Sequence, residues 1–228
     1  MLKHLLELFF PKTCCGCQIP LLNQENILCT SCRHQLPLTL AHKNPNNEMS
    51  QKFKGIVPIE FTASLFYFVK NHFSQEIIHQ LKYKGNQPVG TMLGYWFAHD
   101  LKEVSILQSV DYIIPIPLHP KRLKKRGYNQ VETFGKALSE VLNIPYCDKL
   151  LIKKKHTETQ SQKNKLERQS EASDWFSLTH TNDFTGKHFL LIDDVLTTGF
   201  TLETASRTLL QIPNSKVSIV TMAYARFD

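Results

Sequence analysis

Two adjacent carboxylates, Asp193 and Asp194, directly follow a short apolar run in this chain of 228 residues. A turn rich in hydroxyl groups comes next, and it contains Thr197, Thr198, Gly199 and Thr201. A carboxylate pair suits the vicinal hydroxyls of a sugar or, through water, a metal, and the amides and hydroxyls that begin a helix can hold a phosphate. These residue types predict a site for a ribose 5-phosphate. A buried strand that merely ends in an acidic turn is the plainer alternative.

A buried strand and an amphipathic helix are predicted on either side of this turn. Residues 189–192 are consecutive apolar residues, and apolar residues recur at helical spacing over 202–210. In an open α/β sheet, ligands bind in the crevice outside the carboxyl ends of the strands. We therefore expect Asp193 and Asp194, called the acid pair below, at the carboxyl end of a strand. Residues 197–201, called the phosphate turn, are expected where the helix begins.

A second polar segment begins where another predicted strand, residues 111–116, ends. It carries five basic side chains, those of Lys121, Arg122, Lys124, Lys125 and Arg126. We expect a proline-stiffened loop in which Gly127 leads into a helix over 129–143, on the same sheet edge as the acid pair. Pyrophosphate calls for arginine forks and backbone amides, which makes Arg122 and Arg126 the candidates to bind it. A solvated basic loop and contact with DNA phosphates are the alternatives.

Four of the six cysteines form two Cys-x-x-Cys pairs separated by eleven residues. These four are Cys14, Cys17, Cys29 and Cys32. Four thiolates at this spacing can converge on one tetrahedral Zn²⁺ ion, and so small a segment needs a metal to compensate for its small core. We expect a structural zinc site with residues 18–28 as a hairpin. Cys15 is an alternative ligand to Cys14, and disulfides or a redox pair are the alternatives to zinc.

The net charge of +7 is concentrated in one part of the chain. Residues 111–170 contain 13 Lys and Arg against 6 Asp and Glu, a surplus equal to the whole net charge. Such a region predicts an anionic partner, either a polyphosphate or a nucleic acid. No apolar run reaches the roughly 20 residues that span a bilayer, and no cleavage site follows the apolar residues 5–10. We expect a cytoplasmic chain.

The remaining pattern predicts strands that alternate with helices, and hence a mostly parallel sheet flanked by helices. Strands are expected within 56–68 and over 216–225, and helices over 74–82 and 89–104. The polar residues 40–52 are interpreted as a linker, which divides the chain into a zinc-binding module at 1–50 and an α/β domain at 51–228. The long polar segment 153–174 is expected to be either a lid over a bound substrate or a disordered loop.

Three ordered motifs resemble those of the ComF (competence protein F) family of type I phosphoribosyltransferase-like proteins. They are the double Cys-x-x-Cys, Pro-Leu-His-Pro-x-Arg-x3-Arg-Gly-Tyr-Asn-Gln, and Asp-Asp-Val-x-Thr-Thr-Gly-x-Thr. The resemblance implies the type I phosphoribosyltransferase fold and binding of phosphoribosyl pyrophosphate (PRPP) with Mg²⁺. It also implies a role in natural competence, with single-stranded DNA and DNA-import or DNA-processing proteins as partners.

The resemblance assigns a role to each motif. It implies that the acid pair holds the ribose hydroxyls and that the 5-phosphate is held by Val195, Leu196, Thr197, Thr198, Gly199, Phe200 and Thr201. The pyrophosphate segment would comprise Arg122 and Arg126 with Pro117, Leu118, His119, Lys121 and Gly127. The family's mobile lid is matched at Thr157, Gln160, Glu167 and Arg168. The chain departs from the family pattern at Lys163 and Glu171, which leaves the role of the lid less well supported.

Two functions are compatible with these residues. The first is a phosphoribosyltransferase in which Arg122 and Arg126 neutralise the departing pyrophosphate while the acid pair positions the sugar. The second is a protein without turnover that senses PRPP or a nucleotide, or binds DNA, during transformation. The residues do not distinguish a base from an amine as the acceptor.

Overall fold

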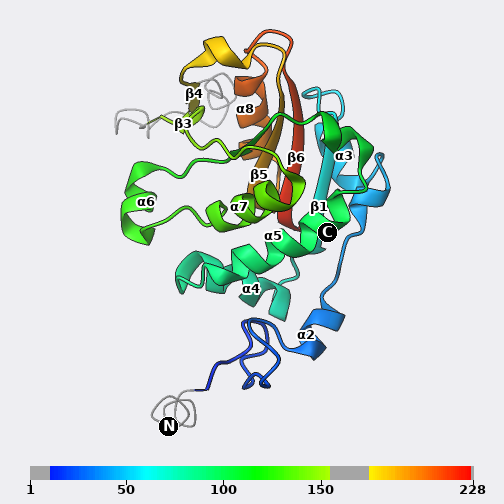
Figure 1. Cartoon of the computed structure of the whole chain (residues 1–228), viewed down its shortest axis with the longest axis vertical. Coiled ribbons are helices and arrows are strands. Elements are labelled where there is room, and N and C mark those ends of the chain that lie inside the picture. Colours follow the sequence, from blue (N-terminus) through cyan, green and yellow to red (C-terminus); the bar gives the residue numbers. More distant parts are fainter. Residues whose placement is uncertain (1–10, 155–174, 227–228) are drawn as a thin grey trace, which may run out of the picture.

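The computed structural model describes residues 11–154 and 175–226 of the chain (Figure 1). Four strands form the main sheet, β1 (Phe61–Tyr67), β2 (Tyr112–Pro115), β5 (His188–Leu196) and β6 (Lys216–Tyr224). A separate hairpin consists of β3 (Leu151–Lys153) and β4 (Phe176–Leu178). The α-helices are α2 (Thr30–Gln35), α3 (Glu48–Phe53), α4 (Phe73–Tyr83), α5 (Pro88–Leu101), α6 (Pro120–Arg126), α7 (Glu132–Leu142) and α8 (Phe200–Leu209). Short 3₁₀ turns lie at Ala41–Lys43, Ser105–Ser109 and Thr181–Phe184.

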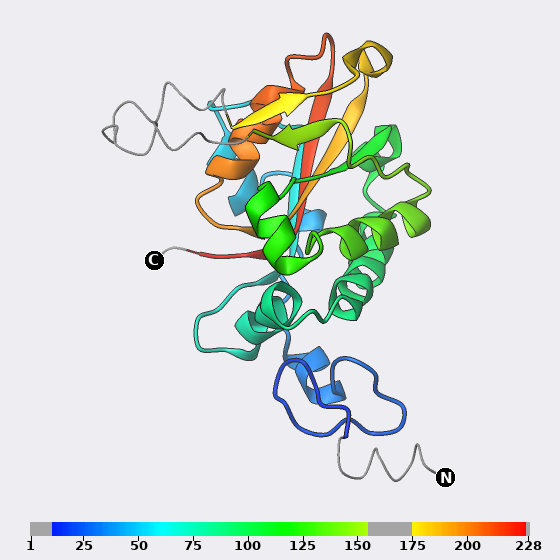
Figure 2. The ribbon, with the colours of Figure 1, turned by 90° about the vertical axis from the view of Figure 1, so that its left-hand side faces the viewer.

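The main sheet is parallel throughout, in the order β1-β6-β5-β2. The central strands β5 and β6 are almost continuously buried and mostly apolar, because helices cover both of their faces. Figure 2 shows α8 on one side of the sheet and α5 with α7 on the other. The predicted α/β architecture of a mostly parallel sheet flanked by helices is confirmed.

Helices α5 and α7 pack closely because one of them presents a glycine at the contact. A Cβ placed on Gly94 of α5 would lie 2.6 Å from the carbonyl oxygen of Phe134 and 2.6 Å from the Cβ of Ala137. Both neighbours belong to α7, so no side chain fits between the helices here. This contact holds α7 and the chain that enters it against the sheet, next to β2.

The segment at 40–52, which we expected to be a linker, is folded against β1. Asn47 is 7% exposed, caps α3 by accepting from the backbone N–H of Met49 and Ser50, and donates to the carbonyl of Thr62 at 2.8 Å. Met49 is fully buried. The linker interpretation is wrong because these polar side chains satisfy backbone groups, and the domain boundary at residue 50 stays a prediction.

Two other expectations about local structure are wrong. Residues 18–28 do not pair with one another as strands, so the predicted hairpin is absent there; Pro20 instead forms an isolated antiparallel bridge with Thr13. The basic residues lie on a helix, α6, rather than in a loop, and Gly127 ends this helix at φ 83° instead of leading into the next one. The predicted lid residues Thr157, Gln160 and Arg168 lie outside the described residues.

Among the described residues, no helix has the length and apolar character needed to cross a membrane.

Candidate functional site

The acid pair lies near the carboxyl end of β5, and its second member is held by two partners. Asp194 Oδ1 is 2.9 Å from the ammonium nitrogen of Lys82, and Asp194 Oδ2 accepts from Gln130 Nε2 at 2.6 Å. The Asp194 side chain is 7% exposed and that of Lys82 24%. Asp194 is therefore largely shielded from water, and both of its oxygens already have a partner, whereas Asp193 is half-buried.

Asp193 has a different environment from its neighbour. Burial and the adjacent charge of Asp194 raise the pKa of Asp193 to about 7, although the N–H of Asp194 and the charges of Lys82 and Lys153 oppose the rise. Two carboxylates side by side cannot both ionise easily in a poorly solvated place. Asp193 therefore exchanges its proton near neutral pH, and in its ionised form it can accept hydrogen bonds from the hydroxyl groups of a ligand.

Lys82 reaches the acid pair because α4 is anchored at both of its ends. At the start of α4, the Phe73 ring packs on the cysteine segment, where a Cβ placed on Gly16 would lie 3.2 Å from that ring. At the end of α4, the Tyr128 hydroxyl donates to the carbonyl of Leu81. The two anchors fix the direction of the last turn of α4, and Lys82 lies on that turn.

Further cations surround the acid pair from two other elements. Arg126 Nη1 donates to Gln130 Oε1, and the Arg126 guanidinium lies 5.6 Å from the centroid of the Tyr83 ring. Lys153 lies at the end of β3, where the charges of Arg122 and Asp193 act on its ammonium group. Burial and the Arg122 charge lower the pKa of Lys153, and the Asp193 charge opposes them. Lysine and arginine side chains from α4, α6 and β3 therefore converge on two carboxylates.

The structure places the basic helix α6 and the acid pair on neighbouring strand ends, as predicted. Strand β2 pairs directly with β5, with Pro115 opposite Ile192, and the N–H of Ile116 donates to the carbonyl of Ile192 at 2.9 Å. His119 caps α6 by accepting from the N–H of Lys121 at 3.2 Å. Pro117 and Leu118 are half-buried between β2 and α6, and Arg122 is exposed on the helix.

The phosphate turn leads directly into α8. Gly199 adopts φ 88°, a left-handed conformation that favours glycine, and precedes the first residue of α8. Thr197 and Thr198 are exposed, and Thr198 Oγ1 accepts from the N–H of Phe200 at 3.4 Å. The first amides of a helix have no acceptor within the helix, so this turn can bind an anion. Thr201 lies in the first turn of α8.

The predicted phosphate-binding segment also contains residues that face the protein interior. The Leu196 side chain is 1% exposed and Val195 is half-buried, because both belong to β5. Phe200 packs edge-on against Trp175, with ring centroids 5.1 Å apart, and so joins the start of α8 to the β3–β4 hairpin. These three side chains shape the turn, and a ligand phosphate would meet the backbone amides and threonine hydroxyls instead.

The four predicted metal ligands converge in the N-terminal part of the chain. The Sγ atoms of Cys14, Cys17, Cys29 and Cys32, together called the four-cysteine cluster, all lie within 4.8 Å of one another. The Cys17 and Cys29 sulfurs are 3.7 Å apart, close to the edge of about 3.8 Å for a tetrahedron with Zn–S bonds of about 2.3 Å. The cysteines are free thiols, so the disulfide alternative is not what the structure contains.

The surroundings of Cys14 favour a thiolate, whereas burial raises the pKa of Cys17 and Cys32. The N–H groups of Gly16 and Cys29 donate to Cys14 Sγ at 3.4 and 3.3 Å. Burial acts to raise the pKa of Cys14, but donors from Cys29, Cys17 and Gly16 outweigh it and bring the pKa to about 7. Cys15 is buried outside the cluster, and its burial raises its pKa to about 12. The geometry selects Cys14 over Cys15, and the four sulfurs fit a closed site for zinc.

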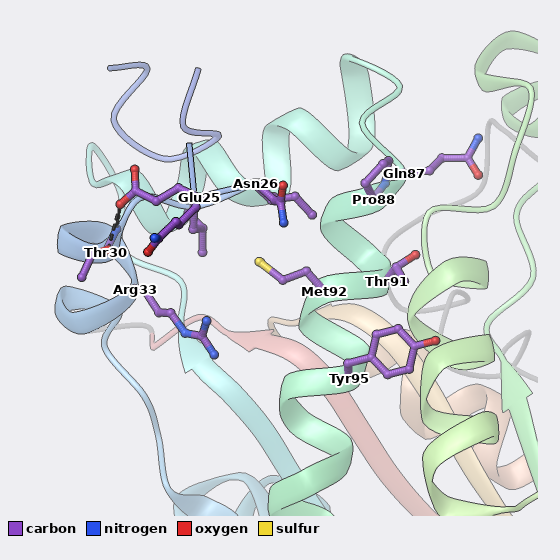
Figure 3. Close-up of a pocket in the computed structure, with 12 residues that line it drawn as sticks. Glu25, Asn26, Thr30, Arg33, Gln87, Pro88, Thr91, Met92 and Tyr95 are labelled. Carbon is purple, nitrogen blue, oxygen red and sulfur yellow. Dashed lines mark hydrogen bonds between the residues drawn. The ribbon is translucent and has the colours of Figure 1, made fainter. Parts of the chain in front are cut away.

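A separate hollow of about 720 Å³ lies between the cysteine segment and α5. Figure 3 shows Thr30 and Arg33 of α2 on one side of this hollow and Met92 and Tyr95 of α5 on the other. Its lining contains no residue of the acid pair or the phosphate turn. The hollow therefore adds nothing to the chemistry of the candidate site.

Three residues that contact or influence the acid pair were absent from the predicted site: Lys82, Gln130 and Lys153. Gln130 is the last residue of the Pro-Leu-His-Pro-x-Arg-x3-Arg-Gly-Tyr-Asn-Gln motif, so this motif could have indicated it. Lys82 and Lys153 are ordinary lysines in a chain with 27 basic residues. No spacing in the sequence distinguishes them from solvent-exposed cations.

Comparison with known proteins agrees with this geometry. A family model described as "Phosphoribosyl transferase domain" matches residues 131–226, which include the acid pair and the phosphate turn but not α6. "Competence protein F" of Haemophilus influenzae is 33% identical over 132 residues, 58% of each chain. "Competence protein ComFC" of Bacillus subtilis is 27% identical over 203 residues, 84% of this chain and 81% of that protein. The chain is therefore similar to proteins of the ComF family over most of its length.

The match to the Haemophilus protein spans less than two thirds of that protein's length. Among solved structures, the glutamine PRPP amidotransferase of B. subtilis has a TM-score of 0.41 with 19% identity, covering 58% of this chain and 25% of that chain.

Proposed function

We propose that this protein is a phosphoribosyltransferase of the ComF type, which binds PRPP with Mg²⁺ and transfers its phosphoribosyl group to an acceptor nitrogen. One observation carries the proposal. The acid pair near the end of β5 is followed directly by a turn that can bind an anion, and this turn leads into α8. The distance between them along the chain is three residues, which suits a ligand that has hydroxyls and a phosphate on one five-membered ring. A ribose 5-phosphate is such a ligand.

In this proposal, Asp193 and Asp194 hold the ribose hydroxyls and the phosphate turn holds the 5-phosphate through its amides and threonine hydroxyls. The pyrophosphate would lie toward α6, where Arg122 and Arg126 supply positive charge. Mg²⁺ would enter with the pyrophosphate and neutralise part of its charge. Because both oxygens of Asp194 are engaged, a metal would approach the acid pair from the side of Asp193, through water.

The reaction replaces one bond at the anomeric carbon by another. The bond from C1 to the pyrophosphate oxygen breaks, a bond from C1 to the acceptor nitrogen forms, and the acceptor loses a proton while pyrophosphate departs. The chain contributes by positioning the sugar and by neutralising the leaving group. Lys153 lies at the end of β3 and interacts electrostatically with Arg122 and Asp193. In this proposal it adds positive charge on the side of the acid pair that faces Arg122.

The relatives' names support a second candidate function. Some of the matched relatives are named as competence proteins and others as DNA utilization proteins. These names fit an accessory role in DNA uptake in which PRPP or a nucleotide is sensed without turnover. The basic helix α6, exposed over most of its length, is the surface that would contact single-stranded DNA or a DNA-processing protein.

Calorimetry with PRPP and Mg²⁺ tests the binding step, and pyrophosphate release with a panel of bases and amines tests turnover. Replacing both Asp193 and Asp194 by Asn keeps the side-chain volumes and removes both charges. We expect this double variant to remain folded and to lose PRPP binding. Unchanged affinity in the folded double variant would refute the sugar-binding role, and PRPP binding without pyrophosphate release for any acceptor would favour the sensor.

A further inference from the structure

The hollow of about 720 Å³ between α5 and the cysteine segment, residues 11–36, has no part in the site described above. Residues 24–28, Thr30 and Arg33 line it from the cysteine segment. Figure 3 shows the Met92 side chain directed from α5 toward the opposite wall. The hollow has the size of a binding site, so the chemistry of its walls decides what it holds.

Both walls of the hollow present apolar side chains. Pro88, Met92 and Tyr95 line it from α5, and because they follow one another at helical spacing they share one face of that helix, called the α5 stripe below. Ile27 and Leu28 line it from the cysteine segment. With a rise of about 1.5 Å per residue, the α5 stripe is roughly 10 Å long.

The two charged groups in this lining already have partners. Glu25 accepts from the backbone N–H of Leu22 at 2.9 Å and from the N–H and the hydroxyl of Thr30 at 2.6 and 2.8 Å, and these donors lower the pKa of Glu25. The Arg33 guanidinium lies 5.2 Å from the centroid of the Trp96 ring, where the face of the ring attracts its charge. The hollow therefore suits apolar side chains better than a small charged ligand.

The sequence of residues 1–10, which precede the described part of the chain, matches such a hollow. Leu2, Leu5, Leu6 and Phe9 occupy the i, i+3, i+4 and i+7 positions that share one face of a helix. From residue 2 to residue 9 a helix would extend roughly 10 Å, which is the length of the α5 stripe. An amphipathic helix with anchors at this spacing is a common ligand of an apolar groove.

The chain that follows this segment runs beside the hollow. The N–H of Leu21 donates to the carbonyl of Lys12 at 2.8 Å, and the N–H of Cys15 donates to the carbonyl of Ile27, a wall residue, at 2.9 Å. Pro11 is four positions before Cys15, and an extended chain covers that interval in at most about 14 Å. Tethering over so short a range gives an effective concentration on the order of millimolar, so an affinity too weak for a separate peptide is sufficient here.

We propose that residues 1–10 dock in the hollow as an amphipathic helix, with Leu2, Leu5, Leu6 and Phe9 against the α5 stripe. Docking covers the apolar walls and fixes the cysteine segment against α5. This role goes beyond the proposed phosphoribosyl transfer and does not depend on it.

Photocrosslinking in the full chain tests where the segment lies. A benzoylphenylalanine side chain placed at Leu6 is on the apolar face of the segment, and one placed at Glu7 is on the opposite face of the same helix and serves as the matched control. We expect the first to crosslink within the monomer to the α5 peptide that contains Met92, with a yield that does not change on dilution, and the second to give little of this product.

Two crosslinking outcomes would overturn the proposal. A product found in dimers and lost on dilution would assign the hollow to the segment of a second copy. Equal yields from the two positions, or products from Leu6 that map outside the walls of the hollow, would show that the segment does not dock there.

Carbon NMR of the methionine methyl groups gives a readout that needs no crosslink. The chain has four methionines, and Met92→Leu identifies the Met92 signal. Leu6→Asp places a charge in the apolar face and is expected to lower the docked population by about tenfold or more, which moves the Met92 signal. The milder Leu6→Ala should move it part of the way in the same direction.

Leu40→Asp is the matched control for this measurement. Leu40 is 48% exposed and does not line the hollow, so the same substitution there should leave the Met92 signal in place. An unmoved Met92 signal in both Leu6 variants would overturn the proposal, and so would an equal movement in Leu40→Asp.

Discussion

Replacing Lys82 by Met should change how the acid pair titrates. Lys82 lies 2.9 Å from Asp194, and its charge also acts to lower the pKa of Asp193, which is about 7 with Lys82 present. Methionine keeps the length and the apolar stem and removes the charge. We expect the Asp193 proton to be held more tightly in the variant, because one of the two lysine charges that oppose its raised pKa is gone.

The size of the effect follows from the geometry. An opposite charge within about 4–6 Å typically changes a carboxyl pKa by about 1–3 units. Because Lys153 remains, we expect the pKa of Asp193 to rise by about 1–2 units. At pH 7 the ionised fraction of Asp193 would then fall from about one half to between about one tenth and one hundredth, so that ribose 5-phosphate binds about 5-fold to 50-fold more weakly.

Two measurements check this expectation. Carbon NMR of protein labelled at the aspartate carboxyl groups gives the titration directly, with Asp193→Asn used to assign the resonance, and needs no ligand. Calorimetry with ribose 5-phosphate between pH 6 and 9 gives the consequence. The affinities of the variant and the unaltered protein should converge toward pH 9, where Asp193 is largely ionised in both.

Lys82→Arg is the control that separates charge from packing. Arginine retains the cation at nearly the same place, so its titration and affinity should resemble those of the unaltered protein. A Lys82→Met variant with an unchanged carboxyl titration would refute the role given to Lys82. Equal losses in the Met and Arg variants, constant across pH, would point to packing of α4 instead.

Three further predictions concern stability, metal and anion binding. The pKa of Asp193 rises from 3.8 to about 7 on folding, so the free energy of unfolding should decrease as the pH rises from about 4 to 7. The stability of Asp193→Asn relative to the unaltered protein should grow over this window and reach an order of 2–4 kcal/mol at pH 8 in chemical denaturation. The four-cysteine cluster should hold one zinc per chain by elemental analysis, and its removal by a chelator should lower the melting temperature, whereas four titratable thiols in metal-free protein as purified would contradict this. Replacing Arg122 and Arg126 by Ala should weaken PRPP much more than ribose 5-phosphate; equal losses, with a slope of log DNA affinity against log salt flattened by about 2, would assign these arginines to nucleic acid.

The sequence was sufficient where the relevant groups are neighbours along the chain. The acid pair, the phosphate turn and the start of α8 occupy one stretch of nine residues, and the spacing of the four cysteines fixes which sulfurs can meet. The apolar runs of β5 and β6 predicted a covered parallel sheet because such strands are buried on both faces.

Helix α6 was missed although its signals are present in the sequence. Pro120 occupies the first helical turn, His119 caps it, and Gly127 ends it in a left-handed conformation. The prolines suggested a stiff loop, and the basic run gave no apolar periodicity because no residue of α6 is buried. A helix without a buried face is recognised by its ends alone.

Only the tertiary structure could decide what surrounds the acid pair. Lys82 and Gln130 are 112 and 64 residues away from Asp194 along the chain, and they meet it because α4 and the entry to α7 pack against the same sheet edge. The raised pKa of Asp193 likewise depends on burial, which no local pattern specifies. Backbone conformation and metal-ligand spacing are encoded within short stretches of chain, whereas the charge and desolvation that set the chemistry of a site arise from residues that only folding brings together.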